Sequence, residues 1–487
     1  MIEAKLIING REETADRLIS VVSPADTRVE LGTVPDAGSE QVDEAVRAAD
    51  AAFPAWSARP LEERQAALVA AAATIHDMIE EYSPVLSREN GKTLEESHID
   101  LEFASGICGY TAGIAAGALQ EQIIRDTGGS TLIRRRAMGP VAAITPWNFP
   151  VVLAFMKIAP ALVAGNTVVL KPSEYSPLVL TEVIRAVQQH FPPGVLNMIT
   201  GGDTAGEALV AHPLIRKIGF TGGTETGRKV MATAARDIKR VTLELGGNDP
   251  AILLEDVDLG EETVRRMAEG AFAATGQVCF GLKRIYVPNH LHDRFVEAFA
   301  AAVDAIAVGP GDDPRTTMGP LNNSAQLRSV EKVLEEAVAG HATVTTLGRK
   351  LDTAAWDHGH YMMPSVVTNA DPSLSIVAKE QFGPTVPIIR YTDVDEVINI
   401  AANSSAFGLA ASIWTQNEER AFELGRRLDS GSVFVNSHSF RSLDPRAPFG
   451  GVKSSGMGRE FSPASIDAYT ELQTISRRIG PPGPPIS

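Results

Sequence analysis

Cysteine is scarce in this sequence: Cys108 and Cys279 are the two examples in 487 residues. Two cysteines cannot build a disulfide framework, and neither belongs to a Cys-x-x-Cys pair or lies near a histidine at zinc-ligand spacing. The sequence therefore predicts no metal site and a reducing, cytoplasmic setting. In that setting, a lone thiol is either a small buried hydrophobe or a reactive group.

Long apolar runs and basic runs are missing as well. The most apolar window, residues 151–170, contains Lys157, Pro160 and Asn166, which argues against a membrane span. The first residues lack the basic and apolar stretches of a secretory signal. The formal net charge of −16 is unfavourable for holding a polyanion. We therefore expect neither a membrane nor a nucleic acid as partner.

Strand-like and helical patterns alternate along most of the chain. The length alone predicts about three structural units. Helical patterns such as residues 177–190 and 224–235 separate short β-branched runs. These runs cover residues 141–145, 167–170, 215–220, 251–254, 284–287, 365–368, 386–391, 411–415 and 432–436. Such alternation predicts an α/β fold with parallel sheets and crossover helices.

A glycine-rich turn follows the strand-like run 215–220. Residues 221–227 read Thr-Gly-Gly-Thr-Glu-Thr-Gly and lead into a helical pattern. Such a turn leaves backbone N–H groups free at a helix N-terminus, where a pyrophosphate can bind. The spacing does not fit a Walker A loop, which needs Lys directly after the last glycine. The turn is therefore either a phosphate site or a plain tight turn, and a second glycine-rich turn, residues 201–206, is interpreted as structural.

Lys171 and Glu174 follow the apolar strand-like run 168–170. In open α/β sheets, ligands bind beyond the carboxyl ends of the strands. A lysine at that edge can hydrogen-bond a ribose hydroxyl, and a carboxylate can bind the ribose diol while repelling a 2′-phosphate. The alternative is that both residues belong to a solvated loop.

Cys279 and Glu244 are the candidate reactive groups. Small residues and Gly276 precede Cys279, which would let a substrate approach the sulfur. Leucines flank Glu244, and such surroundings raise the pKa of a carboxyl group toward that of a useful base. The alternatives are a buried structural cysteine and a helix-end glutamate facing water. Cys108, which lies among small residues, is interpreted as structural.

Seven motifs together resemble the aldehyde dehydrogenase superfamily, and they follow the family's order over nearly the whole chain. They are residues 146–150, the Lys171 segment, and residues 220–227, 243–248, 276–279, 380–384 and 448–456. The resemblance implies oxidation of an aldehyde to the carboxylic acid with NAD(P). It also implies a Rossmann-like cofactor domain, an α/β catalytic domain and a small β arm that joins subunits. The implied extents are 1–118 and 138–246 for the cofactor domain, 247–462 for the catalytic domain, and 119–137 with 463–487 for the arm.

The resemblance also assigns roles to single residues. Cys279 would be the thiolate that attacks a small-molecule aldehyde, forming a thiohemiacetal and then a thioester. Asn148 and the backbone N–H of Cys279 would stabilise the oxyanion. Glu244 would take a proton from the water that hydrolyses the thioester. A homodimer or homotetramer is expected.

Further positions are implied to bind the cofactor or the substrate. The cofactor residues are Ile144, Thr145, Pro146, Trp147, Lys171, Ser173, Glu174, Gly202, Phe220, Thr221, Gly222, Gly223, Thr224, Gly227, Leu245, Gly246, Glu380 and Phe382. The substrate residues are Phe149, Val152, Met156, Phe280, Phe440 and Phe449. The largely apolar substrate set indicates an aliphatic or aromatic aldehyde. NAD is favoured over NADP because Glu174 would repel a 2′-phosphate.

Two departures from the family pattern leave alternatives open. Gly223 stands where many members have serine, so one hydroxyl contact to the pyrophosphate is missing and Thr224 could compensate. The longer loop 437–447 holds Arg441 and Arg446, which either select a substrate carboxylate or are surface arginines. His438 is interpreted as a loop residue. Three rival functions are a coenzyme-A-acylating dehydrogenase, an esterase that uses the cysteine without cofactor, and a non-catalytic structural member.

Overall fold

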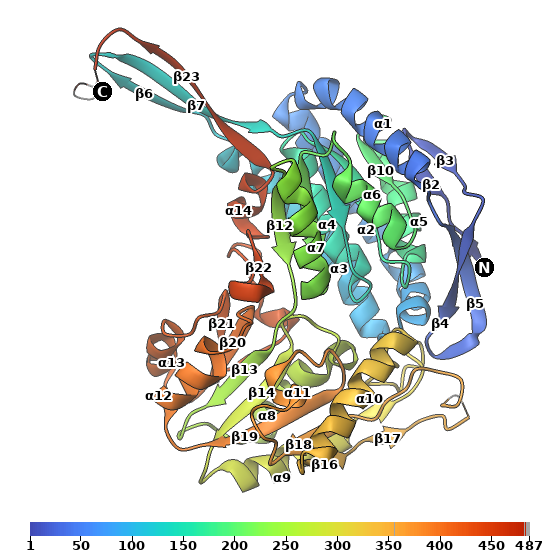
Figure 1. The fold of residues 1–487 in the computed structure, drawn as a ribbon, viewed down its shortest axis with the longest axis vertical. Coiled ribbons are helices and arrows are strands. Elements are labelled where there is room, and N and C mark those ends of the chain that lie inside the picture. The colour runs from blue at the N-terminus through green and yellow to red at the C-terminus, as the bar shows by residue number, and fades with distance from the viewer. Residues whose placement is uncertain (355, 482, 484–487) are drawn as a thin grey trace.

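The computed structural model describes residues 1–354, 356–481 and 483, and arranges them as two α/β sheets with their helices and a protruding arm (Figure 1). The larger sheet has the order β22 (Gly456–Met457), β12 (Arg240–Glu244), β11 (Lys217–Thr221), β8 (Pro140–Ile144), β9 (Thr167–Lys171), β10 (Leu196–Met198), β2 (Leu6–Ile8) and β3 (Arg11–Glu13). The strands from β12 to β10 run parallel. The three outer strands β22, β2 and β3 are antiparallel to their neighbours.

Helices cover both faces of this sheet, because its central strands are apolar on both sides. Val141 and Ala143 of β8 join one hydrophobic cluster, whereas Ala142 joins the other. The helices on the first face are α2 (Leu61–Asn90), α3 (Leu94–Ala118), α4 (Pro150–Val163) and α5 (Leu178–Val187). Those on the second face are α1 (Ser39–Ser57), α6 (Asp203–Ala211) and α7 (Thr224–Arg236). Burial on both faces is typical of parallel strands.

The smaller sheet has the order β16 (Thr343–Thr346), β18 (Ser365–Thr368), β19 (Thr385–Tyr391), β14 (Leu282–Pro288), β13 (Asp249–Leu253), β20 (Ala410–Trp414) and β21 (Ser432–Val435). Apart from the antiparallel edge strand β16, its strands run parallel. One face packs against α8 (Glu261–Phe272) and α9 (His292–Asp304). The other packs against α10 (Ser324–Ala339), α11 (Ser375–Ala378), α12 (Val394–Val397) and α13 (Glu418–Gly425).

The predicted α/β fold with parallel sheets is confirmed, and each of the nine strand-like runs overlaps a strand of these two sheets. Strand β12 was not predicted. The N-terminal strands β1 (Ile2–Glu3), β4 (Leu18–Ser23) and β5 (Asp26–Pro35), which form a separate sheet, were not predicted either. A further small sheet joins β15 (Ala307–Val308) to β17 (Arg349–Lys350). In the part of the chain that the structure describes, no helix is both long and apolar enough to cross a bilayer.

The arm consists of β6 (Gln122–Asp126), β7 (Gly129–Ala137) and β23 (Thr470–Arg478), which pair antiparallel and project away from both sheets (Figure 1). Before β23, α14 (Ser462–Asp467) packs against α3 and α4. The expected domain limits stay a prediction; strand β22, within 247–462, pairs with β12 of the larger sheet. Residues 482 and 484–487 of the expected arm lie outside the described residues.

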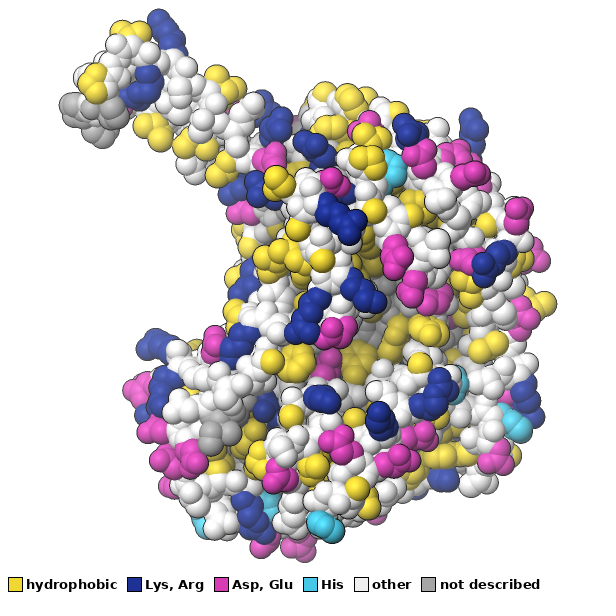
Figure 2. All heavy atoms as spheres, in the orientation of Figure 1, with side chains coloured by type: hydrophobic (Ala, Val, Ile, Leu, Met, Phe, Trp, Pro, Cys, Tyr) yellow, Lys and Arg dark blue, Asp and Glu magenta, His cyan; other side chains and the backbone are white. Residues whose placement is uncertain are grey.

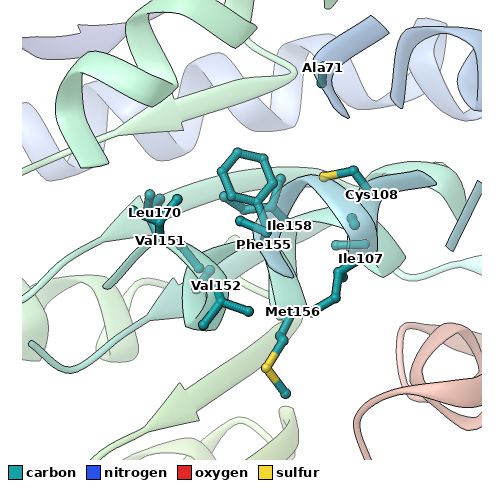
Figure 3. Close-up of a cluster of buried hydrophobic side chains, with 14 of the residues drawn as sticks. Ala71, Ile107, Cys108, Val151, Val152, Phe155, Met156, Ile158 and Leu170 are labelled. Atoms are coloured by element: carbon teal, nitrogen blue, oxygen red, sulfur yellow. The ribbon is translucent and has the colours of Figure 1, made fainter. Parts of the chain in front are cut away.

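Cys108 lies on α3 in the core between α3 and α4. Its side chain is fully buried and belongs to the same hydrophobic cluster as Phe155 and Met156 of α4 (Figure 3). Burial without a charged partner raises the pKa of the Cys108 thiol. The structural interpretation of Cys108 is therefore confirmed.

Candidate active site

The carboxyl ends of the central strands bring the predicted cofactor residues to one edge of the larger sheet. Ile144 pairs with Lys171 and with Phe220, and Thr221 pairs with Glu244. Four residues separate the end of β12 at Glu244 from the start of β13, a strand of the smaller sheet, at Asp249. The candidate site therefore lies where the two sheets meet, as expected for ligands of open α/β sheets.

A tight turn places Cys279 just before β14. Ala274 and Thr275 have left-handed backbone conformations, with φ of 47° and 59°, and Gly276 follows with φ of 71°. A Cβ atom on Gly276 would lie 2.1 Å from Gly383 O, so this glycine serves the turn and its close packing, not substrate access as we expected. Thr275 Oγ1 anchors the turn by donating to Gly319 O at 2.9 Å. Backbone strain of this kind concentrates at functional sites.

Cys279 and Asn148 line the same cavity. Cys279 is half-buried and Asn148 is buried. Asn148 Nδ2 donates to Gln277 O at 2.9 Å, and because that carbonyl can only accept, the bond aims the amide N–H groups at the cysteine loop. Lys92 Nζ donates to Asn148 O at 3.1 Å and fixes the backbone there. The amide therefore keeps one N–H for another acceptor.

Glu244 ends β12 as a buried carboxylate, so the alternative of a water-facing helix end is wrong. Burial raises the pKa of Glu244, and the nearby Glu460 raises it further. Neither carboxylate oxygen has a hydrogen-bond partner among the described residues. A Cβ atom on Gly450 would lie 2.6 Å from Glu244 Oε1, so glycine at this position leaves room for the carboxylate.

A buried ion pair lies beside Glu244. Lys157 Nζ is 2.6 Å from Glu460 Oε1, and the same ammonium donates to Thr221 Oγ1 at 2.6 Å. Thr221, a predicted cofactor residue, therefore uses its hydroxyl within the protein. Removing one partner of a buried pair typically costs about 3–5 kcal/mol of stability, since it leaves the other charge unpaired.

Burial raises the pKa of the Cys279 thiol, and the carboxylates of Glu380 and Glu244 raise it further. The thiol therefore holds its proton at neutral pH until a base removes it.

The glycine-rich turn after β11 has room on its outer side. Gly223 caps the N-terminus of α7, and a Cβ atom built on it would meet nothing within 4 Å. Gly222 N donates to Glu244 O at 3.0 Å, and Thr224 Oγ1 donates to Ser454 O at 3.4 Å. Gly227 serves packing, since a Cβ atom there would lie 2.4 Å from the Leu245 side chain. Like Leu245, Phe220 belongs to the core against α7.

Lys171 and Glu174 lie together after β9. Lys171 Nζ is 3.8 Å from the Glu174 carboxylate and donates to Pro172 O at 3.1 Å. Burial lowers the pKa of Lys171. Ser173 Oγ accepts from the backbone at Tyr175 at 3.3 Å. The solvated-loop alternative is wrong for Lys171, which is buried, whereas Glu174 is half-buried.

Gly202 caps the N-terminus of α6 at the neighbouring strand end, and its N–H donates to Asp36 Oδ1 at 3.3 Å. Thr145 follows β8; its N–H donates to Lys171 O at 3.2 Å, and its Oγ1 is buried with no hydrogen-bond partner in the described residues. Pro146 comes next and is half-buried. An orphaned buried hydroxyl at this edge indicates a polar ligand.

Glu380 and Phe382 approach from the smaller sheet. Glu380 Oε1 accepts from Gly247 N at 3.1 Å, and a Cβ atom on Gly246 would lie 2.2 Å from Glu380 Oε2. Desolvation raises the pKa of Glu380 to about 7. The rings of Phe382 and Trp147 meet edge-on with centroids 5.6 Å apart. These predicted cofactor residues are therefore close neighbours.

Comparison with known proteins decides the family. Residues 11–475 match the aldehyde dehydrogenase family. The chain belongs to this family. It is 37% identical over 469 residues to aldehyde dehydrogenase LUC3 from Fusarium sp, with 96% of this chain and 97% of the relative covered. It is 37% identical over 458 residues to geranial dehydrogenase from Castellaniella defragrans, with 93% and 94% covered.

Solved structures agree with this assignment. Betaine aldehyde dehydrogenase from Staphylococcus aureus, crystallised in complex with NAD+, superposes with a TM-score of 0.94 at 32% identity, covering 99% of this chain and 96% of that chain. As a member of the aldehyde dehydrogenase family, the protein oxidises an aldehyde to the carboxylic acid. The predicted family and reaction are therefore confirmed.

All six predicted substrate residues of this aldehyde dehydrogenase line the Cys279 cavity. They are Phe149, Val152, Met156, Phe280, Phe440 and Phe449. Arg441 and Arg446 do not line it: their side chains are 87% and 80% exposed, and they lie near Glu95 and Asp444 respectively. Neither arginine is therefore placed to meet a substrate carboxylate inside this cavity. Contact of the six residues with a substrate stays a prediction.

His438 is buried beside the loop that carries Cys279, a position that the sequence did not reveal. Its Nε2 lies 2.9 Å from Phe280 O and its Nδ1 lies 2.8 Å from Ser412 Oγ. Desolvation lowers the pKa of His438 to about 4, so the ring is neutral at pH 7. Nε2 thereby contacts the backbone carbonyl that follows Cys279, and Nδ1 contacts a side chain of β20. A single histidine in a polar loop carries no sequence signal for this role.

Sequence reasoning also missed the buried pair of Lys92 and Asp100, whose charged atoms lie 2.7 Å apart beneath the cavity. A signal for it existed: Lys92 and Asp100 flank the start of α3, and Thr93 with Glu96 forms a capping box there. In the described part of the chain, no three His, Cys, Asp or Glu side chains converge as a metal site would require.

Proposed function

We propose that the protein is an NAD-dependent, hydrolytic aldehyde dehydrogenase with Cys279 as nucleophile, Asn148 as oxyanion donor and Glu244 as base. The observation that carries this proposal is the shared cavity of Cys279 and Asn148, with the amide aimed at the cysteine loop. The decisive experiment is a panel of aliphatic, aromatic and acidic aldehydes assayed with NAD and NADP. Formation of the acid with reduction of the cofactor supports the proposal; acyl-coenzyme-A formed in the presence of coenzyme A, in place of the acid, contradicts the hydrolytic step.

The first half of the reaction uses the thiol and the amide. The Cys279 thiol loses its proton to a base, and the sulfur forms a bond to the aldehyde carbon while the carbonyl oxygen becomes an oxyanion. The free N–H of Asn148 Nδ2 and the backbone N–H of Cys279 donate to that oxyanion. When bound, NAD would supply the acceptor for the hydride that the adduct loses, and the adduct would become a thioester.

The second half of the reaction uses Glu244. Its carboxylate takes a proton from water as the water oxygen attacks the thioester carbonyl carbon. The carbon–sulfur bond then breaks, the carboxylic acid forms, and the sulfur regains a proton. The buried carboxylate of Glu244 is suited to this step because its desolvation makes it more basic.

The residues at the sheet edge fit a dinucleotide. The open side of Gly223 and the free N–H groups at the start of α7 offer a cradle for a pyrophosphate. Lys171 and Glu174 would hold the adenosine ribose, Glu380 the nicotinamide ribose, and the buried hydroxyl of Thr145 provides a further polar contact. Because Glu174 carries a negative charge beside Lys171, NAD fits this edge better than NADP.

Glu174→Gln is expected to weaken the discrimination between the two cofactors. Removing the negative charge removes the repulsion of a 2′-phosphate, so kcat/KM for NADP rises relative to that for NAD by about tenfold, the size of one modest charge interaction. Steady-state kinetics with both cofactors measure the ratio, with the exposed Glu423→Gln on α13 as control. A wild-type preference for NADP would contradict the role of Glu174.

Asn148→Ala is expected to lower kcat about 10²–10³-fold, the usual cost of removing one oxyanion donor. The protein remains folded, because the side chain makes one hydrogen bond, to Gln277 O. Initial rates and thermal unfolding of the variant measure the two effects separately. Activity within a few-fold of wild type would remove Asn148 from the mechanism.

We also propose that the arm joins two copies of the chain. Ile123, Ile124, Leu472 and Ile475 leave more than half of their surface exposed on it, and Figure 2 shows apolar side chains along its length. Exposed apolar patches of this kind commonly mark protein–protein contacts. Light scattering that reports a monomer would contradict this proposal.

A further inference from the structure

The walls of the Cys279 cavity are almost entirely apolar. Fifteen residues line it, and apart from Cys279, Asn148 and Asp100 they are aliphatic residues, methionine and phenylalanine. Six phenylalanines contribute. Centroid distances of 4.6 Å for Phe149–Phe440 and 5.2 Å for Phe280–Phe440 show that these rings contact one another. A substrate in this cavity therefore exchanges water for aromatic and aliphatic surface.

The one carboxylate that lines the cavity is already neutralised from within the protein. Asp100 Oδ2 lies 2.7 Å from Lys92 Nζ, and Asp100 Oδ1 accepts from Val152 N at 2.7 Å. Both side chains of the pair are fully buried. Because each oxygen of Asp100 has a partner, this carboxylate is not available to pair with a cationic substrate.

One ring of the cavity wall, that of Phe149, already contacts a cation of the protein itself, the ammonium of Lys92. Lys92 Nζ lies 4.2 Å from the centroid of the Phe149 ring, within the range of a cation–π contact. A substrate cation would therefore have to share the Phe149 ring with Lys92. Because the Lys92–Asp100 pair is neutral as a whole, the cavity offers a quaternary ammonium group no counter-charge.

A carboxylate-bearing substrate finds no partner either. Among the described residues that line the cavity there is no lysine, arginine or histidine, and the ammonium of Lys92 is engaged by Asp100 and Asn148 O. Burying an unpaired carboxylate against phenylalanine rings is strongly unfavourable.

We propose that this site selects neutral, apolar aldehydes and rejects aldehydes that carry a cation or a carboxylate near the carbonyl, with the Lys92–Asp100 pair and the phenylalanine wall as specificity determinants. This inference rests on the proposed function, since it concerns the aldehyde that Cys279 attacks. The relevant property is charge at constant shape, so the test uses substrates that differ in charge and share their size.

Two pairs of matched aldehydes provide the test on the wild-type protein. 3,3-Dimethylbutanal and betaine aldehyde differ by a carbon in place of the charged nitrogen. 4-Methylpentanal and succinic semialdehyde differ by an isopropyl group in place of the carboxylate. Initial rates are measured with saturating NAD, and kcat/KM is referred to the unhydrated aldehyde, whose fraction proton NMR gives. This correction is needed because charged and neutral aldehydes hydrate to different extents.

We expect kcat/KM to favour the neutral member of each pair by about 100-fold or more, as for a charge left unpaired on burial. A ratio above about tenfold in both pairs supports the proposal, and a smaller ratio in either pair overturns it. If none of the four aldehydes is oxidised with NAD or NADP, the proposed function falls together with this inference. If the charged aldehydes are oxidised equally well, the proposed function stands and the inference alone falls.

Substitution at Phe440 tests the apolar wall independently. Phe440 lies on a surface loop and is half-buried, so Phe440→Arg is tolerated better than a charge in the core. We expect Phe440→Arg to raise the ratio of succinic semialdehyde to 4-methylpentanal turnover about tenfold or more relative to Phe440→Gln, the neutral control. An equal ratio in the two variants would remove Phe440 from specificity. Lys92→Met is expected to raise the ratio of betaine aldehyde to 3,3-dimethylbutanal turnover, because it leaves Asp100 without its partner Lys92.

Discussion

Replacing Cys279 by serine lowers aldehyde oxidation by about 10⁴-fold or more, the size typical for loss of a catalytic nucleophile. The reason lies in the surroundings of the sulfur. Burial and the carboxylates of Glu380 and Glu244 already raise the pKa of the Cys279 thiol. A serine hydroxyl at the same position ionises far less readily than a thiol, so the attacking anion is almost absent.

Cys108→Ala is the matched control for this experiment. Cys108 is fully buried between α3 and α4, outside the cavity, so the variant keeps its activity and loses about 1 kcal/mol of stability from the small void. Steady-state rates and alkylation by iodoacetamide measure the outcome, and the half-buried Cys279 is expected to react first. Retention of more than about a tenth of the activity by Cys279→Ser would overturn the assignment of the nucleophile.

Glu244→Gln is expected to stop the reaction after its first half. Without a base for the hydrolytic water, the acyl group stays on Cys279, and turnover falls about 10²–10⁴-fold. Rapid mixing of the variant with aldehyde and NAD should then give a burst of about one NADH per subunit, followed by a slow steady state. Mass spectrometry of the quenched protein should find the acyl adduct.

The stability of this variant separates a chemical effect from misfolding. Because burial raises the pKa of Glu244, the fold disfavours its ionised form, and a neutral isostere removes that cost. The melting temperature of Glu244→Gln is therefore unchanged or higher at pH 7. In the wild type, the hydrolytic rate rises with pH as Glu244 loses its proton. Wild-type steady-state rates without a burst in the variant would show that another group activates the water.

Much of the fold followed from local patterns. The nine β-branched runs overlap strands because parallel strands are buried on both faces and therefore consist of apolar residues throughout. Strand β12 was missed because Arg240, Thr242 and Glu244 interrupt its apolar residues. The N-terminal strands were missed because they are short or largely exposed.

The candidate site, too, could be predicted only in part from the sequence. Cys279, Asn148 and Glu244 stand in recognisable motifs, so their neighbourhood could be predicted from the resemblance. The roles of His438 and of Lys92 beside Asn148 could not, because they depend on contacts between distant segments. His438 meets Phe280 across 158 residues, and Lys92 meets Asn148 across 56. No local pattern of side chains encodes such contacts.

The junction of the two sheets has a consequence for how rate and affinity respond to mutation. Glu244, the proposed base, ends a strand of the larger sheet, whereas Cys279, the proposed nucleophile, comes just before a strand of the smaller one. Their mutual distance therefore depends on how rigidly the two halves of the molecule are held together. Substitutions that loosen the contact between the two halves, far from the cavity, would slow deacylation while leaving the dissociation constant of the nucleotide nearly unchanged. The reason is that the sheet edge that receives the nucleotide belongs mainly to one half.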